Sequence, residues 1–300
     1  MNVPKIKLAY KLYGNPSDPV VIIVQGLGMP LTATPPKLVK NLVKKNLCLL
    51  LIDNRDIGQS DIIDIKPPNI ILEALKYKCG FPVNSCYSLK DMMNDINNLL
   101  ESINVDNAHI IGVSMGGMIA QLMAIHHPGK IKSLTSIMST SGNPKMPGPH
   151  WDVAKFILSG TKNKNINSPV SFYHQLWRLI GSPVYPRSSS ELDEFVDRIM
   201  SRGMTPGGSI RQILAILSSS NRCADLTKLN LPTLVIHGDK DKLVPVECGI
   251  DTAECIPNAK LWLIPGMGHD FPYELLTEFT NRIADHLHSA ENKVQDEKIH

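Results

Sequence analysis

The feature that most constrains this chain is a serine set between glycines at the end of an apolar run. Residues 108–120 read AHIIGVSMGGMIA, in which Gly112, Ser114 and Gly116 form the pattern Gly-x-Ser-x-Gly. The residues before the pattern are typical of a buried strand and those after it of a helix. Glycines weaken both kinds of element, so their presence here indicates a special backbone requirement. We expect a tight, strained turn that points the Ser114 hydroxyl group into a cleft.

The rest of the first half of the chain alternates apolar runs with segments of helical spacing. We expect strands within residues 5–14, 18–26, 46–56, 108–113 and 131–140, and helices within 35–45, 91–104 and 115–129. The alternation resumes with strands within 231–241 and 260–270 and helices from about 246 and within 273–288. Repeated strand–helix–strand order predicts an α/β fold: a mostly parallel central sheet flanked by helices, with right-handed crossovers.

Residues 143–223 interrupt this alternation. They contain no strong strand pattern, but four segments of helical spacing that clusters of Gly, Pro and Ser separate. In parallel-sheet proteins, ligands bind beyond the carboxyl ends of the strands. We therefore expect a core of residues 1–142 and 224–300 and an inserted helical cap of residues 143–223 over that end of the sheet.

Composition narrows the classes of partner. The chain has 300 residues, of which 43% are hydrophobic and 20% charged, as in ordinary soluble domains. Its net charge of +3 is too small to indicate nucleic-acid binding. No apolar stretch approaches the roughly 20 residues of a membrane span, and the N-terminal residues lack the apolar core of a signal peptide. We expect a cytoplasmic protein that binds neither nucleic acid nor membrane.

The cysteines give no sign of a metal site. There are six, with no C-x-x-C pair, which argues against zinc and against a redox motif. We therefore expect neither a metal nor an organic cofactor. Cys79 and Cys86 flank a short loop and could form a bridge, but a reducing cytoplasm favours free thiols throughout. Cys248 and Cys255 are expected to share a partly buried face of a helix.

A nucleophilic serine needs a base, and the base needs a carboxylate that orients it. Asp239 and Asp241 follow the strand expected within 231–241, and His269 follows the next strand in a glycine-bracketed loop. All three would lie at the carboxyl edge of the sheet, near Ser114. The residues alone leave open which aspartate is the acid. Other histidines have simpler structural explanations or fall in the cap: His109, His126, His127, His150, His174 and His237.

The motifs QG at 25–26, DNRDIGQS at 53–60, GVSMGGMIAQ at 112–121, IHGDKDKLVP at 236–245 and GMGHD at 266–270 resemble those of α/β-hydrolase fold esterases. The wording of several stretches is similar to the branch that contains aclacinomycin methylesterase. The resemblance spans both core segments and is weak in the cap. It implies Ser114 as nucleophile, Asp241 as acid and His269 as base.

The resemblance also implies an oxyanion hole, formed by the backbone N–H groups of Leu27 and Met115. Gln25 stands where a histidine is commoner in the family. Because the oxyanion-hole donor at Leu27 is a main-chain N–H, we expect this change to alter local hydrogen bonds more than the oxyanion hole itself. Arg55, Asp56 and Gly58 match the family's turn after the second core strand and are interpreted as structural.

The expected function is a serine hydrolase that cleaves carboxylic esters of small to medium, apolar small molecules through an acyl-enzyme. Met29, Trp151 and Trp177 are the expected substrate-binding residues, and no dedicated clamp for a charged acyl group is expected near Ser114. Two alternatives keep the same three residues. One is hydrolysis of a C–C or lactone bond, and the other is a ligand receptor with little turnover.

Overall fold

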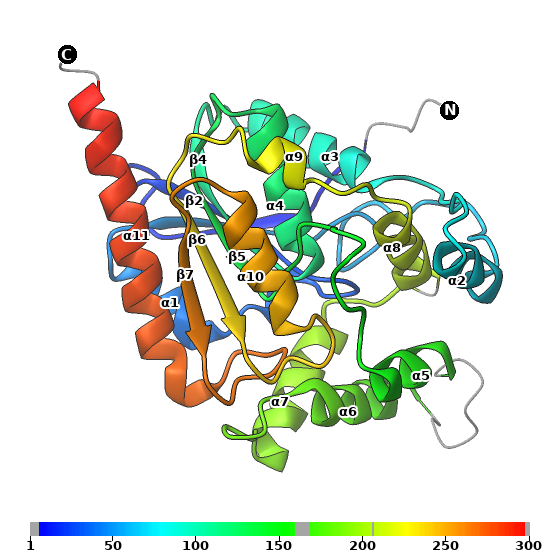
Figure 1. The fold of residues 1–300 in the computed structure, drawn as a ribbon. Coiled ribbons are helices and arrows are strands. Elements are labelled where there is room, and N and C mark those ends of the chain that lie inside the picture. The colour runs from blue at the N-terminus through cyan, green and yellow to red at the C-terminus, as the bar shows by residue number, and fades with distance from the viewer. Residues whose placement is uncertain (1–5, 160–167, 206, 298–300) are drawn as a thin grey trace.

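A seven-stranded sheet forms the centre of the computed structural model, which describes residues 6–159, 168–205 and 207–297. The strands lie in the order β1-β3-β2-β4-β5-β6-β7 (Figure 1). Their bounds are β1 Tyr10–Tyr13, β2 Val20–Val24, β3 Cys48–Ile52, β4 Ala108–Val113, β5 Ile131–Ile137, β6 Thr233–Gly238 and β7 Lys260–Ile264. β1 pairs antiparallel with β3 and every other pair is parallel, so the expected mostly parallel sheet is confirmed.

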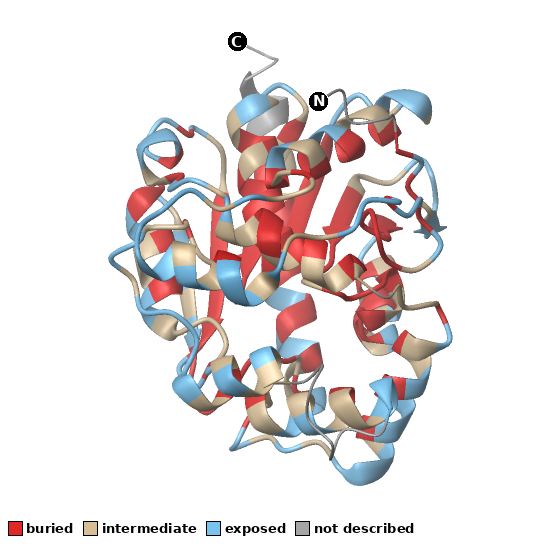
Figure 2. Cartoon of the chain, turned by 90° about the vertical axis from the view of Figure 1, so that its right-hand side faces the viewer, coloured by how far each residue is buried: buried red, intermediate tan, exposed pale blue. Residues whose placement is uncertain are grey.

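The central strands are apolar because both of their faces are covered. Every residue of β3 and of β4 is buried, whereas every residue of the edge strand β1 is exposed. Continuous apolar runs are typical of parallel strands between two layers of helices. Figure 2 shows this arrangement, with buried strands between helices whose outer faces are exposed or intermediate.

Helices cover both faces of the sheet. α1 (Pro36–Val43) and α11 (Leu276–Glu297) pack together on one face, and α3 (Leu89–Ser102), α4 (Met115–His126) and α10 (Val246–Cys255) lie on the other (Figure 1). α3 illustrates why these segments are helical. Ser88 and Asp91 form a capping box at its start, and its buried residues recur at helical spacing.

Of the five helices that the described ranges hold between β5 and β6, four lie wholly within the segment expected to be a helical insertion. They are α5 (Trp151–Ser159), α6 (Pro169–Ile180), α7 (Ser189–Met200) and α8 (Gly208–Leu217). α6 and α7 lie beyond the arrowheads of β6 and β7, at the carboxyl end of the sheet (Figure 1). Their buried residues, including Tyr173, Phe195 and Ile199, form an apolar cluster separate from the two that flank the sheet.

Two α-helices of the described ranges have no counterpart among the expected elements: α2 (Ile70–Lys78) and α9 (Cys223–Leu226). The Asn69 side chain caps the start of α2 by accepting hydrogen bonds from the N–H groups of Ile71 and Leu72. Most apolar side chains of α2 are exposed, so its sequence lacks the buried stripe by which helices are recognised.

The expectation of free thiols is wrong for one pair of cysteines. Cys223, at the start of α9, forms a disulfide with Cys255 at the end of α10. Cys79, Cys86 and Cys248 are free. α9 and α10 pack against each other, which brings two cysteines 32 positions apart to a Cα–Cα distance of 5.3 Å. Cys248 and Cys255 both lie on α10 and both are buried.

Across the described ranges, no helix combines the length and the apolar character needed to cross a bilayer.

Candidate active site

Ser114 lies at the junction between β4 and α4, in a strained conformation. Its φ of 54° and ψ of −119° place an L-residue in a region that it rarely adopts. The neighbouring glycines allow the close approach: a Cβ at Gly112 would meet the carbonyl group of Gly116, and a Cβ at Gly116 would meet that of Val24. The tight strand-to-helix turn expected from the sequence is therefore present, and glycine is required by packing.

His269 and Asp241 come together from the loops that follow β7 and β6. His269 Nδ1 lies 2.7 Å from Asp241 Oδ2, and both residues are buried. The other carboxylate oxygen of Asp241 accepts hydrogen bonds from the backbone N–H groups of Leu243, at 2.9 Å, and Val244, at 2.8 Å. The carboxylate is thus fixed on both oxygens, and it engages the imidazole nitrogen that faces away from a nucleophile in hydrolytic triads.

Asp239, the other candidate acid, is used differently. Its Oδ1 accepts a hydrogen bond of 2.6 Å from the backbone N–H of Gly266, which joins the loops after β6 and β7. It also lies 3.4 Å from the ammonium group of Lys240. Of the two aspartates, Asp241 is therefore the one that contacts His269, whereas Asp239 joins two loops.

A second imidazole lies beside Asp241. His237, fully buried, donates from Nε2 to the carbonyl oxygen of Val244 at 2.8 Å and lies 3.5 Å from Asp241 Oδ2. Burial raises the pKa of Asp241, but His269 and His237 oppose this, and the pKa falls to about 2. The carboxylate therefore stays ionised at neutral pH. Sequence reasoning treated His237 as structural and did not foresee this contact.

Ser114 and His269 line one cavity of about 150 Å³, together with Leu27. Most of the remaining lining is apolar and comes from α6, α7, α8 and the loops around Ser114. The large apolar side chains among them include Met29, Phe172, Tyr173, Leu176, Trp177, Phe195 and Phe271. A small apolar cavity with a few polar groups is typical of a site for a small organic molecule.

The loop after β2 passes directly beside the serine. A Cβ at Gly26 would lie 3.2 Å from the Cβ of Ser114 and 3.7 Å from its Oγ. Among the hydrogen bonds within the described residues, none uses the N–H of Leu27 or of Met115. Gln25, in place of the commoner histidine, donates to the Thr34 hydroxyl group at 2.6 Å and accepts a bond of 3.0 Å from Asn54 through its carbonyl oxygen.

The structure places two of the three expected substrate-binding residues at the cavity and the third away from it. Met29 and Trp177 line the cavity at Ser114. Trp151 lines neither this cavity nor the larger one described below, and it is 69% exposed at the start of α5. The prediction that Trp151 binds substrate therefore finds no support in the lining of this cavity. It rested on its aromatic character within the insertion, whereas the packing of α5 turns the side chain outward.

The side chain of Arg187 also lines the cavity, a position that was not predicted from the sequence. Its Nε lies 3.3 Å from Asp270 Oδ2, and its guanidinium lies 4.5 Å from the centre of the Phe195 ring. Burial raises the pKa of Asp270, which Arg187 opposes. The cation is therefore compensated by a carboxylate. A second cavity of about 580 Å³ lies beyond Trp177, Arg187 and Asp270, which line both spaces.

Comparisons with known proteins agree with this fold. A rhodomycin D methylesterase of Streptomyces peucetius is 23% identical over 92% of this chain and 93% of its own. A 2-hydroxy-6-oxononadienedioate/2-hydroxy-6-oxononatrienedioate hydrolase of Cupriavidus pinatubonensis is 24% identical over 63% and 65%.

Among solved structures, an enol-lactonase from Burkholderia xenovorans LB400 is similar, with a TM-score of 0.72, 19% identity and coverage of 96% of this chain and 98% of that one. A thermophilic esterase from Thermogutta terrifontis has the same TM-score, 20% identity and coverage of 95% and 94%. A family model described as the alpha/beta hydrolase fold matches residues 19–274. The chain therefore belongs to the alpha/beta hydrolase fold family.

Proposed function

We propose that this protein is a serine hydrolase that cleaves carboxylic esters through an acyl-enzyme. Ser114 is the nucleophile, His269 the general base and Asp241 the carboxylate that orients the imidazole. One observation carries the proposal: a strained serine and a carboxylate-bound histidine line the same small apolar cavity. Removal of the hydroxyl proton by the imidazole is what turns a serine into an effective nucleophile.

The proposed reaction has two halves. Ser114 Oγ attacks the ester carbonyl carbon while His269 takes the hydroxyl proton, and the N–H groups of Leu27 and Met115 bind the carbonyl oxygen as it becomes an oxyanion. His269 then gives the proton to the leaving alcohol, and a covalent acyl-enzyme remains. Water, deprotonated by His269, cleaves the acyl-enzyme and restores Ser114.

The substrates that we propose are esters of small to medium, uncharged, apolar groups. The cavity of about 150 Å³ and its aromatic and aliphatic lining support this size and polarity. We further propose that residues 143–223 act as a cap, since Phe172 and Trp177 of α6 and Ile213 of α8 lie in that lining.

The extent of sequence similarity supports ester cleavage as the first choice. The similarity to a protein named as a methylesterase extends over 92% of this chain, whereas that to the protein named as a 2-hydroxy-6-oxononadienedioate/2-hydroxy-6-oxononatrienedioate hydrolase extends over 63%. Sustained turnover of ester substrates would separate an enzyme from a ligand receptor that releases only one equivalent of product.

The proposal is tested by Ser114→Ala. The change should remove nearly all turnover of a p-nitrophenyl ester, with a loss of several orders of magnitude in kcat and little effect on the unfolding transition. An organophosphonate should label Ser114 in the unchanged protein. Labelling at another residue, together with an active Ser114→Ala variant, would show that the assignment is wrong.

A further inference from the structure

Gln212 connects helix α8 to the loop beside Ser114. The side chain is fully buried, and its Oε1 accepts a hydrogen bond of 2.8 Å from the backbone N–H of Gly28, 184 positions earlier in the chain. Its Nε2 donates to the carbonyl oxygen of Arg55, also at 2.8 Å. One amide therefore joins three segments that are far apart in the sequence, and both of its polar ends are used.

The N–H that Gln212 accepts lies in the middle of a tight turn. Met29 N–H donates to the carbonyl oxygen of Gly26 at 3.1 Å, which closes a turn over residues 26–29. Gly28 is its third residue and has a φ of 64°, the sign that type II turns require there. The peptide between Leu27 and Gly28 is the central peptide of this turn, whose orientation distinguishes type I from type II turns. A buried acceptor on its N–H selects one orientation.

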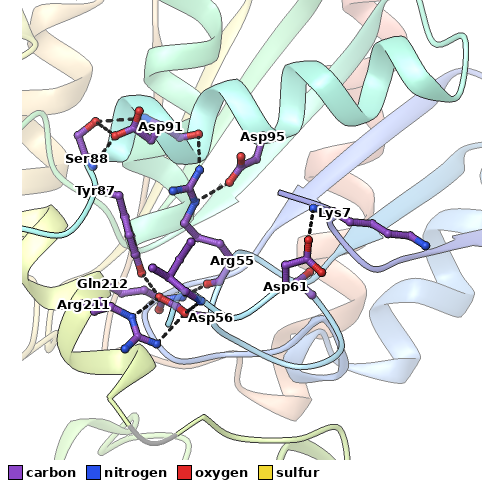
Figure 3. Close-up of polar contacts among 12 residues, drawn as sticks. Lys7, Arg55, Asp56, Asp61, Tyr87, Ser88, Asp91, Asp95, Arg211 and Gln212 are labelled. Atoms are coloured by element: carbon purple, nitrogen blue, oxygen red, sulfur yellow. Dashed lines mark hydrogen bonds and ion pairs between the residues drawn. The ribbon is translucent and has the colours of Figure 1, made fainter. Parts of the chain in front are cut away.

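Helix α8, which carries Gln212, is itself held in place by hydrogen bonds and ion pairs (Figure 3). Arg211, next to Gln212, binds Asp56 through two hydrogen bonds of 2.8 and 2.7 Å, and Asp56 also accepts one of 2.7 Å from the Tyr87 hydroxyl group. The Arg55 side chain binds Asp95 on α3 at 2.6 Å. Buried ionic contacts therefore fix both α8 and the segment of Arg55 and Asp56, between which the Gln212 side chain is held.

We infer that Gln212 is a positioning residue for the oxyanion hole. It ties Gly28 to helix α8 and to the carbonyl oxygen of Arg55, which holds the turn over residues 26–29 in place beside Ser114, and thereby keeps the N–H of the adjacent Leu27 directed toward the oxygen that develops charge there. Gln212 is not among the residues that line the cavity at Ser114, so it acts through Leu27 and Gly28. The inference rests on the proposed ester hydrolysis and adds a requirement to it, namely that α8 orders the site.

The first test is Gln212→Met, which removes both hydrogen bonds while nearly keeping the side-chain volume. Loss of an oxyanion donor costs about 10²–10³ in kcat, and a displaced donor should cost about tenfold or more. We expect this loss in kcat per active site titrated with phosphonate, with KM within about twofold. Affinity for a trifluoromethyl ketone, which forms an oxyanion on Ser114, should fall by the same factor as kcat/KM.

Gln121→Met is the matched control. Gln121 is equally buried, on α4, and accepts a hydrogen bond of 2.9 Å from Arg222 Nε rather than touching the turn over residues 26–29. This variant should lose stability yet keep kcat per titrated site. Equal kcat losses in the two variants, or an unchanged kcat in Gln212→Met, would overturn the inference.

Gln212→Glu decides the matter even if the methionine variant does not fold. A protonated carboxyl group can replace both hydrogen bonds of the Gln212 amide. Its carbonyl oxygen can accept from the Gly28 N–H, and its O–H can donate to the carbonyl oxygen of Arg55. Burial raises the pKa of such a group. The charged side chains on the segments that contact it are already paired, Arg211 with Asp56 and Arg55 with Asp95. The ratio of its kcat to that of the unchanged protein should fall as pH rises from about 6 to about 8.5.

A ratio that stays constant over this range would count against the inference. These outcomes are separate from the failure of the proposed function. Turnover that survives Ser114→Ala rejects ester hydrolysis through that serine, whatever Gln212 does. An inactive Ser114→Ala variant beside fully active Gln212 variants rejects the role of Gln212 alone.

Discussion

At the scale of single residues, two carboxylates only two positions apart have different partners. Asp241 Oδ2 accepts from His269, whereas Asp239 accepts from the backbone of Gly266. Asp241→Asn should lower kcat by about 10⁴, because an amide N–H facing Nδ1 favours the wrong tautomer of the imidazole. Steady-state kinetics on an activated ester is the measurement.

Asp239→Asn is the natural comparison for that change. Its amide oxygen can still accept from the Gly266 N–H, so kcat should change less than about tenfold and any loss should appear as reduced stability. If the two variants exchanged these behaviours, the assignment of the acid would have to be reversed.

At the scale of elements, the junction between β4 and α4 depends on close backbone packing. A Cβ at Gly116 would meet the carbonyl group of Val24 on the neighbouring strand β2. Gly116→Ala should therefore lower the free energy of unfolding by about 1–3 kcal/mol, as overpacking of a core does. Gly129→Ala, where a Cβ would meet nothing within 4 Å, should leave it nearly unchanged. Equal urea midpoints for both variants would contradict the packing argument.

The helices of the insertion should set substrate size. Trp177 of α6 lines both the cavity of about 150 Å³ at Ser114 and the adjoining one of about 580 Å³. Trp177→Ala should join the two spaces and raise kcat/KM for bulky acyl esters relative to acetate esters by about tenfold or more, since even one methylene group of fit is worth about 1–3 kcal/mol. Trp151→Ala, exposed and outside both cavities, is expected to keep the original preference.

At the scale of the whole molecule, the disulfide between Cys223 and Cys255 closes a long stretch of chain that includes β6, the loop of Asp241 and α10. Replacing both cysteines by serine should lower the free energy of unfolding by about 4 kcal/mol, the loss expected when a loop of this length is released in the unfolded state. Reductant should destabilise the unchanged protein by a similar amount and the variant not at all. Equal sensitivity of both to reductant would argue against the bond.

The sequence by itself was sufficient for the features that depend on neighbouring residues. Apolar runs and helical spacing follow from how a short segment buries one face, and they predicted a mostly parallel sheet flanked by helices. The spacing of Gly112, Ser114 and Gly116 predicted the strained turn because the glycines and the serine that it involves are adjacent. Ser114, Asp241 and His269 could also be found from the sequence, because each lies shortly after an apolar run that predicts a strand.

Other features were decided only by the tertiary structure, because they join residues that the sequence separates widely. Cys223 meets Cys255 through the packing of α9 on α10, and Gln212 reaches Gly28 across 184 positions. The residues around Cys223 and Gln212 form no local sequence pattern that identifies their partners. Likewise, composition could not separate Trp177, which faces the cavity, from Trp151, which faces outward, because the way a helix packs against its neighbours fixes which of its faces is buried.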